Sequence, residues 1–488
     1  MNKAYMKWLK DSHKNICIFL LVMEIILGFL PVVTEGFHHI GTATYNTSIA
    51  MITIASIAAA VILPMFFFRY IHKKNSVDLY FSLPVSRKEQ LITTVVFLLI
   101  TVSGSFLIST LLVWIFCHTD HNFFWQWILM QPWMIYGTLT VILITVCVYA
   151  LANNIFDGFV MVCAYAALPM VIDMAYESFI GNLVAGHPYS SSLDFWEYFS
   201  PLWMTGHNIA GISTISEFIF RFSFIPVLAI YILVACFGLN RNFIHRQSER
   251  AEQTSDSFLT YPFIGNAYLF LLLLSSVFTS YSSTAEPVDV IFCFLLFLCY
   301  IIASFVYHRS MKFHWTYLLG YGIALGLSFL IASAGWNSHG FGLADRYRLY
   351  TEKYLVYDYT MSCDPEDLGK FDDTSDISVD VTMEIPVSQK DQYADEIRIM
   401  ENLRKKEIRK YYRDRNNLTS IGNLNVYNTR QSIYNNNVQS FNDWSYGIYD
   451  PLSEEQLKQL DKKGKVEIYD SQTGKTVSLS EYLSDRKK

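Results

Sequence analysis

The sequence predicts an α-helical polytopic membrane protein that carries a small α+β domain at its carboxyl end. Hydrophobic residues make up 52% of its 488 positions and charged residues only 16%, a composition typical of membrane proteins. The charges are unevenly spread, since residues 339–488 hold more than half of the 37 basic and 43 acidic residues. A soluble domain is therefore expected after a membrane domain. The net charge of −6 argues against nucleic acid as a partner.

Nine apolar segments are long enough to cross a bilayer, whose core of about 30 Å requires roughly 20 helical residues. They cover residues 16–33, 49–69, 91–116, 133–151, 159–176, 219–238, 264–281, 288–307 and 315–334. Apart from Arg221, the lysines and arginines before residue 337 fall in alternate loops. Basic loops stay in the cytoplasm, so we expect a multi-pass protein of the bacterial cell membrane with its amino terminus inside. An odd number of spans, which depends on the turns at 152–158 and 307–314, places the tail outside.

Residues 1–15 are expected to form an amphipathic helix on the membrane surface. At about 100° per residue, the lysines of this segment share one sector and the apolar residues take the opposite one. The lysines are Lys3, Lys7, Lys10 and Lys14, and the apolar residues are Tyr5, Leu9 and Ile16. The alternative is a frayed basic tail whose lysines only follow the rule that basic residues stay in the cytoplasm.

The loop at 70–90 combines basic residues with apolar ones that do not suit a fully solvated loop. The apolar residues are Val77, Leu79, Tyr80 and Phe81. Ser76 is expected to cap a short helix here and Pro84 to end it. Exposed aromatic residues on such a helix indicate docking into a partner's groove. The alternative is a helix lying on the membrane.

The loop at 177–218 contains many aromatic residues but no Lys or Arg. A segment of this kind predicts a re-entrant or interfacial hairpin at the outer leaflet.

Three of these stretches resemble the permease subunits of ABC-2-type exporters, in particular firmicute permeases with additional carboxy-terminal spans and an extracellular domain. The first is the amphipathic helix before the first span. The second is Ser-Val-Asp-Leu-Tyr-Phe-Ser-Leu-Pro-Val-Ser-Arg at 76–87, which is similar to the family's cytoplasmic coupling segment. The third is Phe-Ile-His-Arg-Gln-Ser-Glu-Arg-Ala at 243–251, which resembles the basic segment that closes a six-span core. Glu252 departs from the glycine expected next.

The resemblance implies a six-span permease core at 16–255, three additional helices at 256–338 and an extracytoplasmic domain at 339–488. It also implies a second permease, identical or similar, and separate cytoplasmic ATPase subunits that carry the ATP and Mg²⁺. The residues that would couple to the ATPase are Ser76, Val77, Asp78, Leu79, Tyr80, Phe81, Leu83 and Pro84. This chain is not expected to be an enzyme or to hold a cofactor. Its Gly-Lys-Thr at 474–476 follows Tyr469 where a phosphate-binding loop requires glycine.

Glu24 lies in the middle of the first apolar segment, and a carboxylate inside a membrane is a functional candidate. It would either line a translocation path or form a structural hydrogen bond with a neighbouring helix. Asp173 and Arg221, at the outer ends of the fifth and sixth spans, are expected to form a structural pair. Histidines in two outer loops suggest a metal site only weakly, because helical His spacing is absent; these loops contain His38, His39, His118, Asp120 and His121. No metal is predicted.

The carboxy-terminal domain is expected to contain strands at 355–360, 377–385, 466–469 and 476–479, the last two forming a hairpin. A charged helix is expected from about 389 to 413. Residues 416–442 contain nine asparagines and are expected to form a long loop.

The leading hypothesis is the permease of an ATP-driven exporter for an amphipathic or hydrophobic substrate, such as an antimicrobial peptide or a lipid-like compound. The alternative is a membrane receptor whose outer domain binds a ligand and signals to a cytoplasmic partner. A secondary transporter would show several intramembrane charges and an inverted repeat, which this sequence lacks.

Overall fold

The computed structural model describes residues 3–35, 42–116, 121–186, 200–210, 224–253, 257–282, 287–308, 311, 315–343, 354–363, 377–414, 422–431, 438–448, 452–470 and 475–481. The chain divides into two units. The first contains Met1–Ile172, Phe195–Tyr268 and Phe305–Met311, and the second contains Asp173–Asp194, Leu269–Ser304 and Lys312–Lys488.

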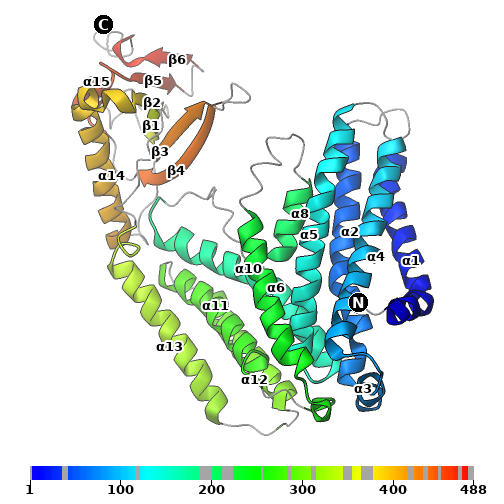
Figure 1. Cartoon of the computed structure of the whole chain (residues 1–488). Helices are drawn as coiled ribbons and strands as arrows, with labels where there is room; N and C mark the ends of the chain where they lie inside the picture. Colours follow the sequence, from blue (N-terminus) through cyan, green and yellow to red (C-terminus); the bar gives the residue numbers. More distant parts are fainter. Residues whose placement is uncertain are drawn as a thin grey trace. The chain divides into compact units, whose positions relative to one another are not determined.

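The first unit is a bundle of long apolar helices. Its elements are α1 (Lys3–Glu35), α2 (Thr42–Phe67), η1 (Arg69–His72), α3 (Lys74–Phe81), α4 (Arg87–Phe116), α5 (His121–Leu151), the first part of α6 (Ile155–Leu183), α8 (Pro201–Ala210), α10 (Ile225–Leu239), η3 (Asn240–Ile244) and η4 (Ser248–Arg250). The helices α1, α2 and α4 pack against one another, while α5 packs against α2, α4, α8 and α10 (Figure 1).

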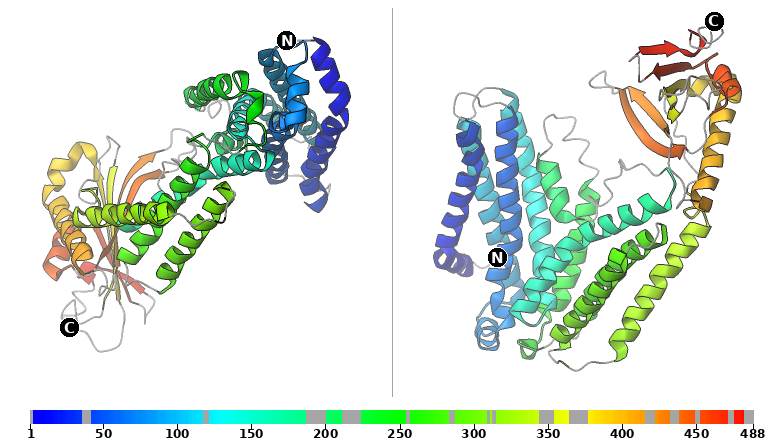
Figure 2. Two further views of the ribbon diagram at one scale, coloured as in Figure 1. Left: turned by 90° about the horizontal axis from the view of Figure 1, so that it is seen from below. Right: turned by 180° about the vertical axis from the view of Figure 1, so that it is seen from behind.

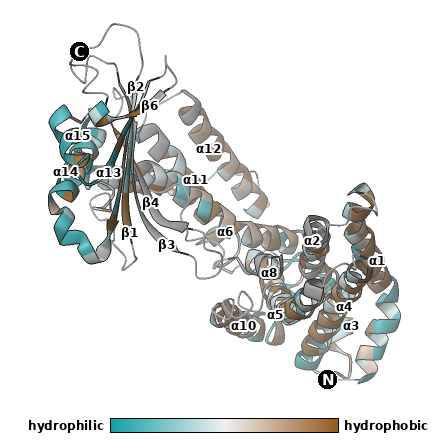
Figure 3. Ribbon diagram, turned by 90° about the horizontal axis from the view of Figure 1, so that it is seen from above, coloured by the Kyte–Doolittle hydropathy of each residue, from teal (hydrophilic) through white to brown (hydrophobic). Residues whose placement is uncertain are grey.

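Eight helices of the described residues are long and apolar enough to cross a membrane, which identifies an α-helical polytopic membrane protein. A helix is present at each of the nine predicted segments. The seventh, in α11 (Tyr261–Ser282), has a shorter apolar stretch at Tyr261–Val277 and is not among the eight. The sixth, α10, begins at Ile225, several residues after the predicted start. Figure 3 shows hydrophobic residues along α1, α2 and α6 and hydrophilic ones on α14.

The amphipathic character predicted for residues 1–15 is present in the first turns of α1. Tyr5 and Leu9 are buried, while the four lysines of this stretch are exposed. The segment is not a separate helix, because α1 continues from Lys3 to Glu35. Figures 1 and 3 show its first turns bent away from the rest of the helix.

Small residues bring the helices of the bundle close together. This is usual in membranes, where the hydrophobic effect does not drive helices together and close van der Waals packing does. A side chain at Gly28 of α1 would place its Cβ 2.6 Å from the Cδ1 of Ile52 on α2. Gly137 of α5 faces Thr205 of α8 in the same way. Thus α8, which lies in the predicted outer hairpin, packs on the bundle, while 187–199 and 211–218 of that hairpin lie outside the described residues.

The second unit contains a six-stranded antiparallel sheet with the order β4-β3-β1-β2-β5-β6. The strands are β1 (Tyr354–Cys363), β2 (Ile377–Pro386), β3 (Gly422–Gln431), β4 (Val438–Ile448), β5 (Lys465–Asp470) and β6 (Lys475–Ser478). Its helices are the end of α6, most of α11, most of α12 (Pro287–His308), α13 (Trp315–Asn337), α14 (Ala394–Asp414) and α15 (Glu454–Leu460). Figure 2 shows α14 running alongside the sheet.

Alternate residues of the strands build the core of this sheet. Tyr357 and Tyr359 of β1 and Val379 and Val381 of β2 are fully buried together with Met400 of α14. Their neighbours in sequence point to the opposite face, as the two-residue period of a strand requires. The predicted hairpin of β5 and β6 is confirmed by their antiparallel pairing.

The predicted loop at 416–442 is wrong, because β3 and β4 form a hairpin across most of it. Leu424 and Val426 are buried in the core, while Asn423 and Asn425 occupy the alternate positions. Asn423 and Asn425 therefore lie on the polar face of β3. The high asparagine content of this stretch hid the alternation of polar and apolar residues that marks a strand. The predicted charged helix is α14, preceded by a 3-10 segment η6 (Val387–Tyr393).

Candidate coupling surface at α3

The helix α3 connects α2 to α4 through the short turn η1. It begins at Lys74, after Lys73, and it ends at Phe81, before Pro84, as predicted. Ser76 does not cap it, contrary to the prediction, because Ser76 lies within the first turn and the N-cap Lys73 makes no side-chain hydrogen bond. A side chain distant in sequence accepts a hydrogen bond from the first residue of the helix: the Lys74 N–H donates to Glu252 Oε1 at 3.4 Å.

One face of α3 is fixed to the bundle by aromatic rings. Val77 is buried, and the ring of Tyr80 stacks on that of Tyr70 with 4.0 Å between centroids and 10° between planes. Trp8 of α1 contacts Tyr80 edge-on at 6.2 Å. Burial raises the pKa of both the Tyr70 and the Tyr80 hydroxyls. The amphipathic start of α1 is thereby attached to the same ring cluster as α3.

The turn after α3 is fixed by Arg87 and Gln90 at the start of α4. The Arg87 guanidinium lies 3.8 Å from the ring centroid of Phe81 and donates to the carbonyl oxygens of Ile244, at 3.3 Å, and of Arg246. Gln90 Nε2 donates to the Tyr80 carbonyl oxygen at 2.9 Å. These contacts join α3, α4 and the segment after α10.

The opposite face of α3 and the turn after it form an exposed patch, which we call the α3 surface: Asp78 and Leu79 of α3, and Leu83 and Pro84 of the turn. Leu79 is 64% exposed and Leu83 is 37% exposed. The aromatic residues expected at this surface, Tyr80 and Phe81, are instead partly buried against the bundle. The α3 surface therefore offers a partner two leucines beside one carboxylate, next to the exposed Lys74 and Asn75 at the start of the helix.

The segment after α10 packs behind α3. It starts as the π-helix η3 at Asn240–Ile244. Arg246, which follows, is buried. It donates from Nη1 to the Ala150 carbonyl oxygen at 2.7 Å and from Nη2 to Asn153 Oδ1 at 3.2 Å. A cation at the end of α5 complements the helix dipole. Burial, followed by repulsion from Arg250, lowers the pKa of Arg246 to about 10. The sequence prediction missed Arg246 and Asn153, although the first lies in the basic segment and the second in the predicted 152–158 turn.

Glu252 has a left-handed backbone conformation, with φ at +65°. This conformation favours glycine, which explains why a glycine is expected at this position. Its N–H donates to the Asn153 carbonyl oxygen at 2.8 Å, so the turn is held in place by the α5–α6 connection.

His72, at the end of η1, is only 1% exposed and packs edge-on against Tyr149 at 4.4 Å. Neither ring nitrogen forms a well-aligned hydrogen bond to the described residues. Burial lowers its pKa to about 3, the nearby Arg246 adds to this effect, and the backbone of Asn153 and Tyr149 opposes it. His72 is therefore neutral at physiological pH.

Glu24 lies in the three-helix core of α1, α2 and α4 and is fully buried. Ser56 of α2 donates to its Oε1 at 2.7 Å, and Ser109 of α4 donates to its Oε2 at 3.5 Å. Of the two predicted roles, this geometry favours the interhelical hydrogen bond.

The remaining predicted sites are not brought together by the described residues. Asp173 lies in α6, and its expected partner Arg221 lies outside the described residues. Of the candidate metal ligands, only His121, the first residue of α5, lies within them; the others are His38, His39, His118 and Asp120. Within the described ranges, no three His, Cys, Asp or Glu side chains are grouped as a metal site.

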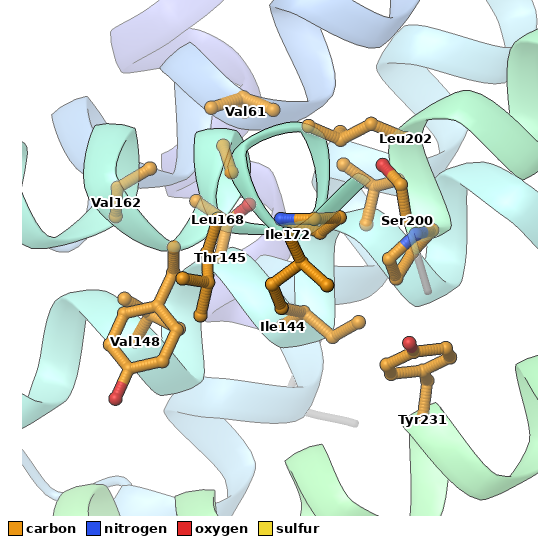
Figure 4. A pocket seen from close by; sticks show the side chains of 15 residues that line it. Val61, Ile144, Thr145, Val148, Val162, Leu168, Ile172, Ser200, Leu202 and Tyr231 are labelled. Atoms are coloured by element: carbon orange, nitrogen blue, oxygen red, sulfur yellow. The ribbon is translucent and has the colours of Figure 1, made fainter. Parts of the chain in front are cut away.

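A cavity of about 260 Å³ lies between α2, α5, α6, α8 and α10 (Figure 4). Its walls are almost entirely aliphatic, including Val61, Ile144 and Leu168, and its polar groups include Thr145 and Tyr231. A space of this chemistry suits an apolar ligand.

No protein-family model matches the chain, and neither does any curated protein or solved structure.

Proposed function

We propose that the chain is the transmembrane permease subunit of an ATP-driven ABC exporter. The observation that carries this proposal is the α3 surface. A short helix between two long apolar helices exposes Asp78 and Leu79, and the turn after it exposes Leu83. The other face of the helix is held by Tyr80 and Arg87. A helix that transmits a push must be exposed on one side and rigidly attached on the other, and α3 has both properties.

The expected partner of the α3 surface is a separate cytoplasmic ATPase subunit, which would bind ATP and Mg²⁺. A second permease, identical or similar, would complete the transport unit. In this arrangement the amino terminus and α3 lie in the cytoplasm, and the carboxy-terminal domain is extracytoplasmic. The charge distribution before residue 337 supports this orientation.

The proposed cargo is an amphipathic or hydrophobic molecule, such as an antimicrobial peptide or a lipid-like compound. The aliphatic cavity of Figure 4 supports this class, because its wall has few polar groups to hold a sugar or an ion.

The test is co-purification of the chain with its ATPase, followed by measurement of permease-stimulated ATP hydrolysis. Asp78→Arg combined with Leu79→Asp replaces the exposed face of α3 without touching its buried residues. We expect stimulation to fall at least about tenfold, because interface centres of this kind contribute about 2 kcal/mol. Lys88→Ala is the control, since Lys88 is exposed nearby on α4. Unchanged stimulation in the double variant, or the absence of any ATPase partner, would refute the proposal.

A receptor is the second candidate, and the attachment of α14 to the ends of α6 and α13 favours it. The Tyr412 hydroxyl donates to the Leu183 carbonyl oxygen at 2.6 Å and accepts from the Ala185 N–H at 3.2 Å. Its ring stacks on His339 at 4.8 Å. Ligand binding to the sheet would thus act on two apolar helices. This candidate predicts ligand binding by a 339–488 fragment and no ATP-dependent transport.

A further inference from the structure

A second cavity, of about 570 Å³, lies where α2 ends and α6 begins. We call it the Arg69 groove. Its walls come from three helices and their connections: Ile62, Met65, Phe66, Arg69, Tyr149, Asn154, Ile155, Phe156 and Phe159. The volume falls in the range of about 300–1,000 Å³ that is usual for small-molecule sites.

The groove is apolar along its length and charged at one end. Phe66, Phe156 and Phe159 are exposed aromatic residues, so the groove opens to the side of the bundle. Among the described residues that line it, Arg69 is the only charged one, and Asn154 and Tyr149 are the only other polar ones. Arg69 and Tyr149 line the same groove. An exposed aromatic trough ending at a guanidinium matches an amphiphile with an anionic head.

Arg69 lies at the depth expected for a membrane surface. It comes shortly after the candidate span Ala43–Phe67 and precedes the basic residues Lys73 and Lys74. The apolar wall residues of α2 and α6 belong to the candidate spans Ala43–Phe67 and Ile155–Gly181. The charged end of the groove is therefore at headgroup depth, while its apolar part is at acyl-chain depth.

The cavity of Figure 4 shares the helices α2, α5 and α6 with the Arg69 groove. Its wall residues Val61, Val148 and Val162 are each next to or one turn from a residue of that groove. The two cavities together present a guanidinium, aromatic rings and aliphatic side chains. These groups match the phosphate and the acyl chains of a phospholipid.

We infer that the Arg69 groove binds an anionic phospholipid, with the phosphate at Arg69 and an acyl chain along Phe66, Phe156 and Phe159. The planar guanidinium fork matches phosphate oxygens geometrically and electrostatically. This site does not depend on the α3 surface or on an ATPase, so it stands whether or not the chain is an exporter.

The test is native mass spectrometry of the purified full-length chain in detergent, titrated with phosphatidylglycerol or with phosphatidylcholine of the same chains. We expect the anionic lipid to bind more tightly. Arg69→Gln should weaken its binding about fivefold, the effect of one basic residue near a lipid headgroup, while Arg69→Lys should weaken it less. Lys73→Gln is the matched control, because it removes the same charge from the same basic cluster without altering the groove.

Equal losses in Arg69→Gln and Lys73→Gln would overturn the inference, since general attraction to the basic cluster would then explain binding. Equal binding of the two lipids would also overturn it. Inorganic phosphate serves as the third probe: if it competes at concentrations similar to those of the lipid, the site recognises a free anion rather than a phospholipid. Unchanged thermal unfolding of the variants shows that their effects do not come from misfolding.

Discussion

His72 and Arg246 are two basic side chains buried near each other behind α3, and they respond to burial in different ways. Arg246 keeps its charge because Ala150 and Asn153 accept its hydrogen bonds. His72 forms no well-aligned hydrogen bond to the described residues, and burial lowers its pKa to about 3, so it stays neutral. The packing of η1 against Tyr149 therefore requires an uncharged imidazole.

The first prediction concerns pH. Between about pH 6.5 and 3 the unfolded chain binds a proton at His72 that the folded chain does not, so folding stability falls as pH falls through this window. The slope is at most about 1.4 kcal/mol per pH unit. Thermal unfolding of the wild type and of His72→Phe, measured from pH 7.5 to 4.5, should show a flatter dependence for the variant. Identical pH dependences would contradict a neutral buried His72.

The second prediction concerns the left-handed turn at Glu252. Glu252→Gly and Glu252→Ala both remove the carboxylate near Lys74, but only the glycine relieves the backbone strain at φ +65°. The glycine variant should unfold at a higher temperature than the alanine variant, by the equivalent of about 1 kcal/mol. The reverse order would show that this backbone conformation is not maintained in the protein.

The third prediction separates the two roles of Glu24. Glu24→Gln keeps an acceptor for Ser56, so stability and ATPase stimulation should both be retained. Glu24→Leu removes the acceptor from both serines and should cost about 1–2 kcal/mol of stability. Thermal unfolding and ATPase assays on both variants check this. A glutamine variant that folds normally but has lost stimulation would indicate a carboxylate on the transport path.

At the scale of elements, apolar length and turn residues were sufficient to locate most helices, because a span needs many consecutive apolar residues. The end of α3 was also predictable from Pro84. The orientation of α3 was not, since Leu79 and Tyr80 are both apolar and only the positions of Tyr70 and Trp8 decide which is buried. In the same way, β3 escaped prediction because its pairing with β1, distant in sequence, stabilises an asparagine-rich strand.

The fourth prediction concerns the contact between α1 and α2. Gly28→Val places methyl groups where Ile52 already lies, so the helices must separate. Overpacking of this kind costs about 1–3 kcal/mol. Unfolding in detergent should show this loss. Gly104→Val, where no atom lies within 4 Å of the added Cβ, should be close to neutral and serves as the control.

At the scale of the whole molecule, the sequence alone predicted a membrane part followed by a folded domain, because charge and apolar length differ so clearly between them. The structure describes helices at all nine predicted segments, of which eight are long and apolar enough to span. The sidedness of the tail depends on whether α11, with its shorter apolar stretch, crosses the membrane.

The fifth prediction tests the proposed sidedness. Single cysteines replace Asn75 of α3 and Glu455 of α15, both exposed, in a chain without other cysteines. A membrane-impermeant maleimide applied to intact cells should label Glu455→Cys but not Asn75→Cys. After lysis both should react. Labelling of neither in intact cells would mean an even number of crossings and a cytoplasmic tail.

The hydrogen bonds of Arg246 also set an order of assembly during synthesis. Its acceptor at Ala150 lies 96 residues earlier in the chain. At the usual rate of about 5–20 residues per second, the end of α5 is made roughly 5–20 s before the guanidinium that completes it. During this interval Trp8, Tyr70 and Tyr80 have been made, whereas residues 240–252 have not. The ribosome must therefore deliver α10 before the α3 surface reaches its final rigidity.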